Sequence, residues 1–243
     1  MNKAPSPTAT LRYYLSPAHA CGYLPDRQAV MATIDPQTVL NQTLYSQLAR
    51  MGFRRSGSHI YRPQCPDCQA CIPLRIAVRD FRPRRSQRRC WHQNQVIQVN
   101  ETDASFNEQH FALFQRYVNK QHANGGMDNP EATDYLSFLT SPAIDTRFFE
   151  FRHKEQLLAV AVTDYLNDGL SAVYTFYDPE MNKHSPGVFT LLWQIEHCRQ
   201  LELDYLYLGF WITASRKMRY KDQYRPCEIL TPNGWRQLDT AAS

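Results

Sequence analysis

The fold is decided by SAVYTFYDP at residues 171–179 and by three runs that follow it: SPGVFTLLWQIEHCRQL at 185–201, YLYLGFWI at 205–212 and KMRYKDQY at 217–224. Their residue types predict, in order, a strand, a loop, a helix, a buried strand and a basic loop. This order is common in folds that transfer acyl groups, where a strand edge and the start of the next helix hold the reacting carbonyl. The second half of the chain therefore predicts an acyl-transfer fold.

Patterns before this segment predict the rest of that unit. Apolar residues at helical spacing indicate helices at 105–122 and 131–140, with a break at 124–126 between them. Strands follow at 148–153, 157–166 and 170–178, and Asn167-Asp168-Gly169 joins the last two as a hairpin turn. Helix, helix, three strands, helix and strand is the order of an α/β (α+β) unit of the acetyltransferase type, called GNAT-like.

Composition argues for a folded, water-soluble chain. Of 243 residues, 43% are hydrophobic and 12% aromatic, which excludes a disordered protein. No window approaches the roughly 18 consecutive apolar residues of a membrane span. The first ten residues, MNKAPSPTAT, lack the apolar core of a signal peptide and predict a loose polar start. We expect a cytoplasmic monomer that uses no membrane.

Positive charge is concentrated in one segment. Residues 50–92 contain 11 Arg, no Lys and two Asp, a net charge of +9 in a chain whose total is +4. The change in composition near residue 100 predicts a Cys- and Arg-rich domain at 1–100 and a GNAT-like domain at 101–243. Within FRPRRSQRR at 81–89, a set of side chains suits phosphate contacts, and we expect it to bind nucleic acid rather than form only a solvated basic face. The set is Arg84, Arg85, Ser86, Gln87 and Arg88.

Seven cysteines in a cytoplasmic chain predict reduced thiols. Cys65, Cys68 and Cys71 have the spacing C-x₂-C-x₂-C, and C-x₂-C is the usual spacing of two thiolates on one zinc. Cys21 is the first choice for a fourth ligand, with Cys90 or His92 behind it. The alternatives are a structural zinc, an iron–sulfur cluster, or thiols without a metal.

Two polar motifs flank the predicted helix at 188–199. Asp178-Pro179 ends a strand, so its carboxylate either orients an amine at the mouth of the sheet or caps a turn. Residues 215–224 follow a buried strand and combine cations with tyrosines, which favours a contact surface over a solvated loop. The side chains concerned are Arg216, Lys217, Arg219, Tyr220 and Lys221.

Taken together, these runs resemble the bacterial aspartate/glutamate leucyltransferases, relatives of the eukaryotic arginyl-tRNA–protein transferases. The resemblance covers residues 11–235. Besides the runs above, it rests on YYLSPAHACGYLPDRQA at 13–29, CPDCQACIPLRI at 65–76, LLAVAVTD at 157–164 and KMRYKDQYRPCEIL at 217–230.

The resemblance implies transfer of leucine from Leu-tRNA to the N-terminal α-amine of proteins that begin with Asp or Glu, which marks them for degradation. It implies a GNAT-like fold beside an N-terminal Cys-bearing region, and no cofactor for the chemistry. Arginyl transfer from Arg-tRNA and a non-catalytic RNA-binding module are alternatives. An acetyl-CoA-dependent acetyltransferase is disfavoured, because the Q/R-x-x-G-x-G/A loop that binds pyrophosphate is absent.

The resemblance also suggests roles for residues. We expect Asp178 to orient or deprotonate the amine, Tyr174 and Tyr177 to shape the site, and Asp164 to act as the second carboxylate. A further group would hold the acidic side chain of the target or the 3′ end of the tRNA: Lys217, Arg219, Tyr220 and Lys221. Three more arginines are candidates for the acidic side chain: Arg12, Arg27 and Arg75.

The chain departs from the eukaryotic pattern at the cysteines and at one turn. The motif C-G-Y-C is replaced by Cys21-Gly22-Tyr23-Leu24, and the adjacent cysteine pair by Ala70-Cys71. Half of that metal set is therefore missing. The usual S-L-G turn is Ser185-Pro186-Gly187, and proline is tolerated at a helix start.

Overall fold

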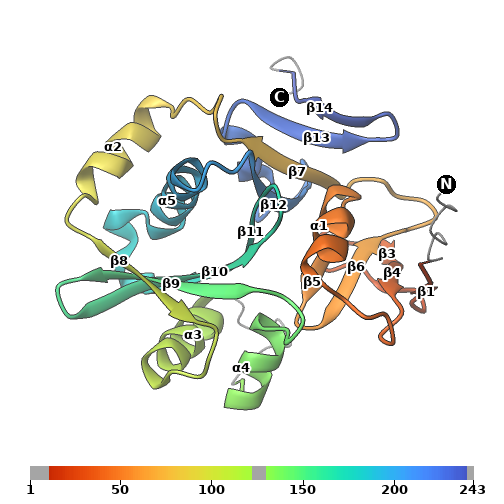
Figure 1. Cartoon of the computed structure of the whole chain (residues 1–243), viewed down its shortest axis with the longest axis horizontal. Coiled ribbons are helices and arrows are strands. Elements are labelled where there is room, and N and C mark those ends of the chain that lie inside the picture. Colours follow the sequence, from red (N-terminus) through yellow and green to blue (C-terminus); the bar gives the residue numbers. More distant parts are fainter. Residues whose placement is uncertain (1–10, 122–129, 240–243) are drawn as a thin grey trace, which may run out of the picture.

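A computed structural model of the chain describes residues 11–121 and 130–239. The predicted loose start at 1–10 and the break at 124–126 lie outside these residues. The described part forms a large sheet in the order β14-β13-β7-β12-β11-β10-β9-β8, in which only β11 and β12 pair in parallel (Figure 1). Its strands are β7 (Ile72–Ala77), β8 (Gln98–Asp103), β9 (Thr146–His153), β10 (Gln156–Tyr165), β11 (Gly169–Tyr177), β12 (Tyr205–Trp211), β13 (Cys227–Thr231) and β14 (Gly234–Gln237).

Helices cover both faces of this sheet (Figure 1). On the inside of its curve lie α5 (Pro186–Gln200) and α2 (Arg85–Gln93), and on the outside lie α3 (Glu108–Gln121) and α4 (Ala132–Leu139). On β10, Ala159 and Ala161 pack in the α5 core, whereas Val160 and Val162 pack in the α3–α4 core. Burial on both faces explains the unbroken apolar run of this strand.

A smaller sheet in the order β1-β4-β6-β5 lies beside the large one. Its strands are β1 (Tyr13–Leu15), β4 (Met31–Ile34), β5 (Arg54–Ser56) and β6 (His59–Pro63), with a hairpin of β2 (His19–Ala20) and β3 (Gln28–Ala29) next to them. Helix α1 (Gln42–Arg50) covers it, and the Asn41 side chain caps α1 by accepting a hydrogen bond from the Leu44 amide at 2.9 Å. Short 3₁₀ turns complete the described elements: η1 (Pro179–His184) and η2 (Arg219–Gln223).

The two sheets share a core. Tyr45, Leu48 and Ile60 from the small-sheet side pack with Leu166 and Tyr207 of the large-sheet side. Residues before position 100 also supply β7, α2 and the start of β8 to the large-sheet unit. The division of the chain into two domains at residue 100 stays a prediction.

The α/β architecture is confirmed, with the predicted helices at α3 and α4 and the predicted hairpin between β10 and β11. Across residues 11–121 and 130–239, no helix combines the length and the apolarity needed to cross a membrane.

Candidate functional site

The parallel strands β11 and β12 separate partway along their length. They pair only where Gly169–Ser171 lies against Tyr205–Tyr207. Beyond that point, β11 continues to Tyr177 and β12 to Trp211 without pairing to each other. We call the opening between residues 172–177 and 208–211 the wedge. Main-chain groups that face it have no strand partner there, so they are available for side chains or ligands.

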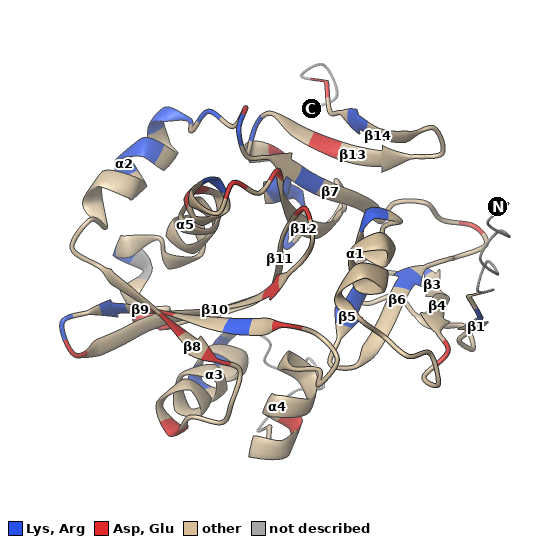
Figure 2. Ribbon diagram, viewed as in Figure 1, with Lys and Arg blue, Asp and Glu red and all other residues tan. Residues whose placement is uncertain are grey.

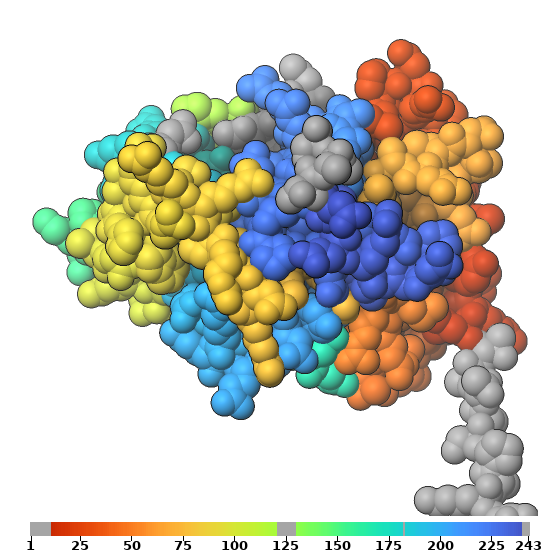
Figure 3. Space-filling model, turned by 90° about the horizontal axis from the view of Figure 1, so that it is seen from above, coloured from red at the N-terminus to blue at the C-terminus, as the bar shows by residue number. Residues whose placement is uncertain are grey.

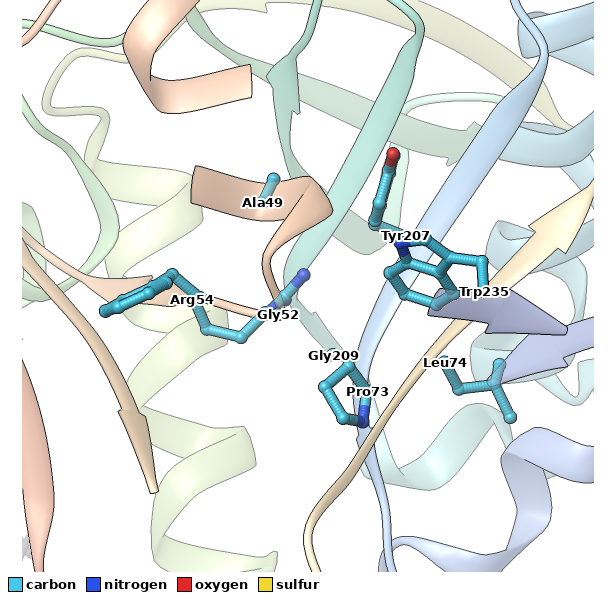
Figure 4. A pocket seen from close by; sticks show the side chains of 9 residues that line it. Ala49, Gly52, Arg54, Pro73, Leu74, Tyr207, Gly209 and Trp235 are labelled. Carbon is cyan, nitrogen blue, oxygen red and sulfur yellow. The ribbon is translucent and has the colours of Figure 1, made fainter. Parts of the chain in front are cut away.

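Arg54, from β5 of the small sheet, lies at the closed end of the wedge. It donates from Nη1 to the Ser171 hydroxyl at 2.8 Å and from Nη2 to the Ala172 carbonyl at 2.7 Å. Gly209 of β12 has φ +73°, and a Cβ there would lie 2.9 Å from Arg54 Nε. Figure 4 shows Arg54 and Gly209 lining the same small pocket, together with Tyr207 and Trp235. The sequence signal for this contact was Gly209, a single glycine inside a buried strand, because such a glycine can mark the close approach of another segment.

Lys221, in η2, contacts the same strand, β12. It is 7% exposed and donates from Nζ to the carbonyl of Phe210, the residue after Gly209, at 2.7 Å. Burial and the nearby Arg54 charge lower the pKa of Lys221 to about 7. Lys221 is therefore enclosed, whereas Lys217 and Arg219 of the same segment are exposed, and the substrate-binding role of these cations stays a prediction.

Aromatic side chains line the β11 side of the wedge. The rings of Tyr117 and Tyr177 lie 4.8 Å apart, and those of Tyr117 and Tyr174 lie 6.2 Å apart. Tyr220, 40% exposed, lies close to Tyr177 and Arg54. The predicted residues Tyr174, Tyr177, Tyr220 and Lys221 thus gather at one site, which Arg54 completes.

The hydroxyl of Tyr174 is unusual within this group. It is buried and has no hydrogen-bond partner in the described part of the chain. Burial raises the pKa of Tyr174 to about 12, so the phenol stays protonated at neutral pH. An unpaired buried hydroxyl is costly, which makes it a candidate contact for a ligand.

Asp178 lies at the end of β11, next to Tyr177. Its Oδ1 accepts from the Glu180 amide at 3.0 Å, and its Oδ2 lies 4.0 Å from Arg116 Nη2. The side chain is 13% exposed. The structure therefore shows the turn-capping role for Oδ1, while Oδ2 makes only the long ion pair with Arg116.

Asp164 has a different position from the one predicted. Its side chain is completely buried and accepts hydrogen bonds from Arg55, Tyr45 and Thr146. Every carboxylate oxygen is occupied by the scaffold and none faces the wedge. This placement corrects the prediction that Asp164 is a second catalytic carboxylate.

The predicted phosphate-binding surface lies on α2. Arg84, Arg85, Ser86 and Arg88 are exposed, and the ribbon in Figure 2 is coloured for basic residues along α2 and the segment before it. Gln87 is instead buried: its Oε1 accepts from the Arg84 amide at 2.8 Å, and its Nε2 donates to the Gln223 carbonyl at 3.2 Å. Gln87 is thus corrected to a structural link between α2 and η2, whose segments lie side by side in Figure 3.

Of the three other predicted arginines, two are exposed and one is buried. Arg12 and Arg27 are exposed. Arg75 is buried, pairs through Nε with Glu228 Oε2 at 2.7 Å, and stacks on Tyr205 with its guanidinium carbon 3.5 Å from the ring centroid. Because Arg75 already has a carboxylate partner, its predicted role in binding an acidic substrate is corrected to a structural one.

The four predicted metal ligands are half-buried thiols. Burial, together with the neighbouring Cys21, Cys65 and Cys68, raises the pKa of Cys71 to about 12. These thiols are therefore close to one another, but no group of three or more His, Cys, Asp or Glu side chains among the described residues is arranged to hold a metal ion. Of the reserve ligands, Cys90 is buried in the α2–α5 core and His92 is exposed. Metal binding stays a prediction.

Known proteins match both halves of the chain. A family model described as "Arginine-tRNA-protein transferase, N terminus" matches residues 19–89, and one described as "Arginine-tRNA-protein transferase, C terminus" matches residues 109–231.

Two relatives are named aspartate/glutamate leucyltransferase. The protein from Alcanivorax borkumensis is 51% identical over 229 residues, which cover 94% of this chain and 95% of that protein. The protein from Teredinibacter turnerae is 48% identical over 235 residues, which cover 96% of this chain and 97% of that protein.

A solved structure shares the fold. The structure of L-PGS from Bacillus licheniformis superposes with a TM-score of 0.52 and 10% sequence identity, covering 70% of this chain and 59% of that chain. At this identity the similarity concerns the fold alone, and it confirms the expected GNAT-like architecture.

Proposed function

The chain belongs to the arginine-tRNA–protein transferase family, and we infer that it transfers leucine from Leu-tRNA to the N-terminal α-amine of proteins that begin with Asp or Glu. This inference rests on relatives with that name, which share 48% and 51% sequence identity with this chain over nearly its full length. We further propose that the transfer marks its targets for degradation and that the enzyme acts as a cytoplasmic monomer.

The reaction depends more on positioning the two substrates than on activating them. An aminoacyl-tRNA is an activated ester, so the enzyme must hold an amine against the ester carbonyl, accept a proton and stabilise the oxyanion. Orientation alone supplies about 7 kcal/mol or more when the reacting atoms are well placed. We assign this placement to the wedge, where main-chain groups of β11 and β12 without a strand partner face the site and supply fixed hydrogen-bonding dipoles.

Side chains along β11 take the remaining roles. The α-amine has an ordinary pKa of about 8, so a weak base or a relayed water suffices to remove its proton. Asp178, whose Oδ2 makes only a long ion pair with Arg116, orients the amine or accepts that proton. The apolar rings around Tyr174 and Tyr177 offer the surface that a leucine side chain requires.

The tRNA is held by charge. Exposed arginines on α2 suit the phosphate backbone, and their segment lies beside η2, which carries Lys221 at the wedge. A tRNA bound along α2 would thus lie on the same side of the molecule as the site that receives its 3′ end. The metal, if one binds the four cysteines, takes no part in these steps.

A transfer assay tests the function. The purified chain is incubated with labelled Leu-tRNA or Arg-tRNA and with peptides that begin with Asp, Glu, Ala or Lys. Label that moves from Leu-tRNA only to the Asp and Glu peptides supports the proposal. Label from Arg-tRNA would instead identify an arginyltransferase, and tRNA binding without transfer would indicate a binding module.

A further inference from the structure

The strand β1 combines exposed apolar side chains with an open edge. Tyr13, Tyr14 and Leu15 are 49%, 58% and 55% exposed, and no other consecutive large hydrophobic residues are exposed in the described part of the chain. Because β1 is the outermost strand of the small sheet, it pairs with β4 on one side and with no strand of residues 11–121 and 130–239 on the other (Figure 1). A run of exposed apolar residues on a folded chain is typical of an interaction surface.

The open side of β1 also presents main-chain donors and acceptors. Tyr14 lies directly opposite a residue of β4. Two residues beyond it, the Ser16 amide donates to β4 at 2.9 Å, and two residues before it, the Arg12 carbonyl accepts from the residue that follows β4 at 3.0 Å. In an antiparallel pair, such hydrogen-bonded residues alternate with residues whose N–H and C=O groups point away from the partner strand. The alternating residues here are Tyr13 and Leu15, so their main-chain groups face the open side.

A row of side chains connects β1 with the wedge. Arg54 of β5 lies opposite Tyr61 of β6. Tyr61 lies opposite Thr33 of β4, and Thr33 lies opposite Tyr14 of β1. Opposite residues of a sheet project from the same face, so this row shares the face on which Arg54 contacts Ser171 of β11. The row spans three strand spacings, about 14 Å, which an extended chain crosses in about four residues.

The charge around β1 favours a polypeptide over a nucleic acid. Residues 11–49 contain two Arg, two Asp and neither Lys nor Glu, so their net charge is zero. Residues 82–89, which include the start of α2, contain five Arg and no acidic residue (Figure 2). A nucleic acid is held through positive charge, whereas an extended polypeptide is held at a sheet edge through main-chain hydrogen bonds. The two macromolecular substrates of a transferase can therefore approach the wedge over different surfaces, the tRNA over α2 and the polypeptide over the small sheet.

We propose that the open edge of β1 binds the chain of the target protein downstream of its N-terminal residue, as an added strand. This proposal deepens the proposed function and rests on it, because it needs a polypeptide whose first residue reacts in the wedge. Targets share only that first residue, so the following chain must be held by contacts that do not depend on sequence. Main-chain hydrogen bonds to Tyr13 and Leu15 meet this requirement. The length of the row places this contact at about the fifth residue of the target or beyond it.

The length of the peptide substrate tests this surface. We compare kcat/KM for peptides of three and of ten residues that begin with the same sequence, starting with Asp. Because the longer peptide adds two or more hydrogen bonds, the wild type should prefer it by about tenfold or more. A ten-residue peptide whose main-chain nitrogens are methylated from the fifth residue onward lacks the donors of a strand, so it should react no faster than the short one. A methylated peptide as reactive as the unmethylated one would overturn the proposal.

Leu15→Pro and Leu15→Ala are the matched variants. Both shorten an exposed side chain, but only proline also removes an amide, one that faces away from β4, so both variants should keep the pairing of β1 with β4 and the wild-type melting temperature. Leu15→Pro should lose most of the preference for the longer peptide. Leu15→Ala and the control Val96→Ser, a change of an exposed residue before β8, should keep it. The KM for Leu-tRNA should stay unchanged in all three variants, and an undiminished length preference in Leu15→Pro would contradict the proposal.

Two other results would also overturn it. Loss of Leu-tRNA affinity in Leu15→Pro with an intact length preference would assign the edge to the nucleic acid. A wild-type dimer in analytical ultracentrifugation that becomes a monomer in Leu15→Pro would assign the edge to a second copy of the chain.

Peptide binding without tRNA separates this surface from the enzymatic function. Fluorescence anisotropy, with the label at the C-terminus of the peptide, measures the affinity of the three-residue and ten-residue peptides. Tighter binding of the ten-residue peptide to the wild type than to Leu15→Pro, in a chain that transfers no leucine, would keep the polypeptide surface and remove the function. Equal affinities of the wild type and Leu15→Pro, in an active enzyme, would keep the function and overturn the surface.

Discussion

Arg55 of the small sheet and Asp164 of the large sheet form a two-pronged ion pair in which both side chains are completely buried. Nη2 lies 2.6 Å from Oδ1, and Nε lies 2.7 Å from Oδ2. Because neighbouring residues of a strand point to opposite sides, this pair holds β5 in the orientation that directs Arg54 into the wedge. The pair therefore links the packing of the two sheets to the geometry of the site.

Breaking this pair should unfold the protein readily. Asp164→Leu leaves the buried Arg55 without a counter-charge and should lower the free energy of unfolding by about 3–5 kcal/mol in urea titrations. The double variant Arg55→Met/Asp164→Leu should recover much of that loss. Asp204→Ala, which breaks an exposed pair with Arg79, is the control and should change little. A loss in Asp164→Leu no larger than the control's would contradict the structural role.

Asp178→Asn separates the two roles of Asp178. Asparagine retains the oxygen that accepts from the Glu180 amide, so the turn and the melting temperature should be preserved. If the carboxylate orients or deprotonates the amine, the transfer rate should fall by about 10²- to 10⁴-fold. Single-turnover rates at saturating Leu-tRNA measure this. A fully active Asp178→Asn enzyme would leave Asp178 only its capping role.

Tyr174→Phe tests whether the unpaired hydroxyl meets a substrate. Because that hydroxyl has no partner in the described residues, its removal should leave thermal stability unchanged or slightly raised. A contact with the substrate would then appear as a higher KM or lower kcat. Tyr135→Phe, which removes another buried and unpaired hydroxyl, on α4, is the matched control and should affect neither constant. Unchanged kinetics in Tyr174→Phe would exclude the contact.

The α2 arginines should control tRNA affinity through salt dependence. Arg85→Gln and Arg88→Gln should each weaken binding of every tRNA to a similar degree and reduce the slope of log K against log salt by about 0.7–0.9 per lost contact. Filter binding at several salt concentrations measures the slope. Arg236→Gln, an exposed change on β14, is the control. Slopes that match the control would move the tRNA surface elsewhere.

Lys221 should make stability depend on pH in a defined window. Its pKa is about 7 in the folded state and 10.5 ordinarily, so between these values the unfolded chain binds more protons and stability rises with pH. Lys221→Met should lack this contribution. It should be more stable than the wild type near pH 7, and the difference should shrink toward pH 10.5. A difference that is constant over this range would mean that Lys221 is not desolvated.

Local patterns predicted much of the fold but less of the site. The α3 and α4 helices, the hairpin at Asn167-Asp168-Gly169 and the order of elements in the second half follow from spacing and turn residues, which act over short stretches of chain. The tyrosines of the site were found because they lie within that segment. Arg54 was missed, because it reaches the wedge from a strand more than a hundred residues away in sequence.

By itself, the sequence determined the family, the α/β class and the residue types available at the wedge, since these depend on ordered motifs and on local periodicity. Only the tertiary structure decided which charges have partners. Asp164 and Arg75 became structural because distant strands bring them carboxylate or guanidinium partners. Arg54 and Lys221 received none among the described residues. Burial and counter-charge depend on which remote segments pack together, and that information does not reside in any one motif.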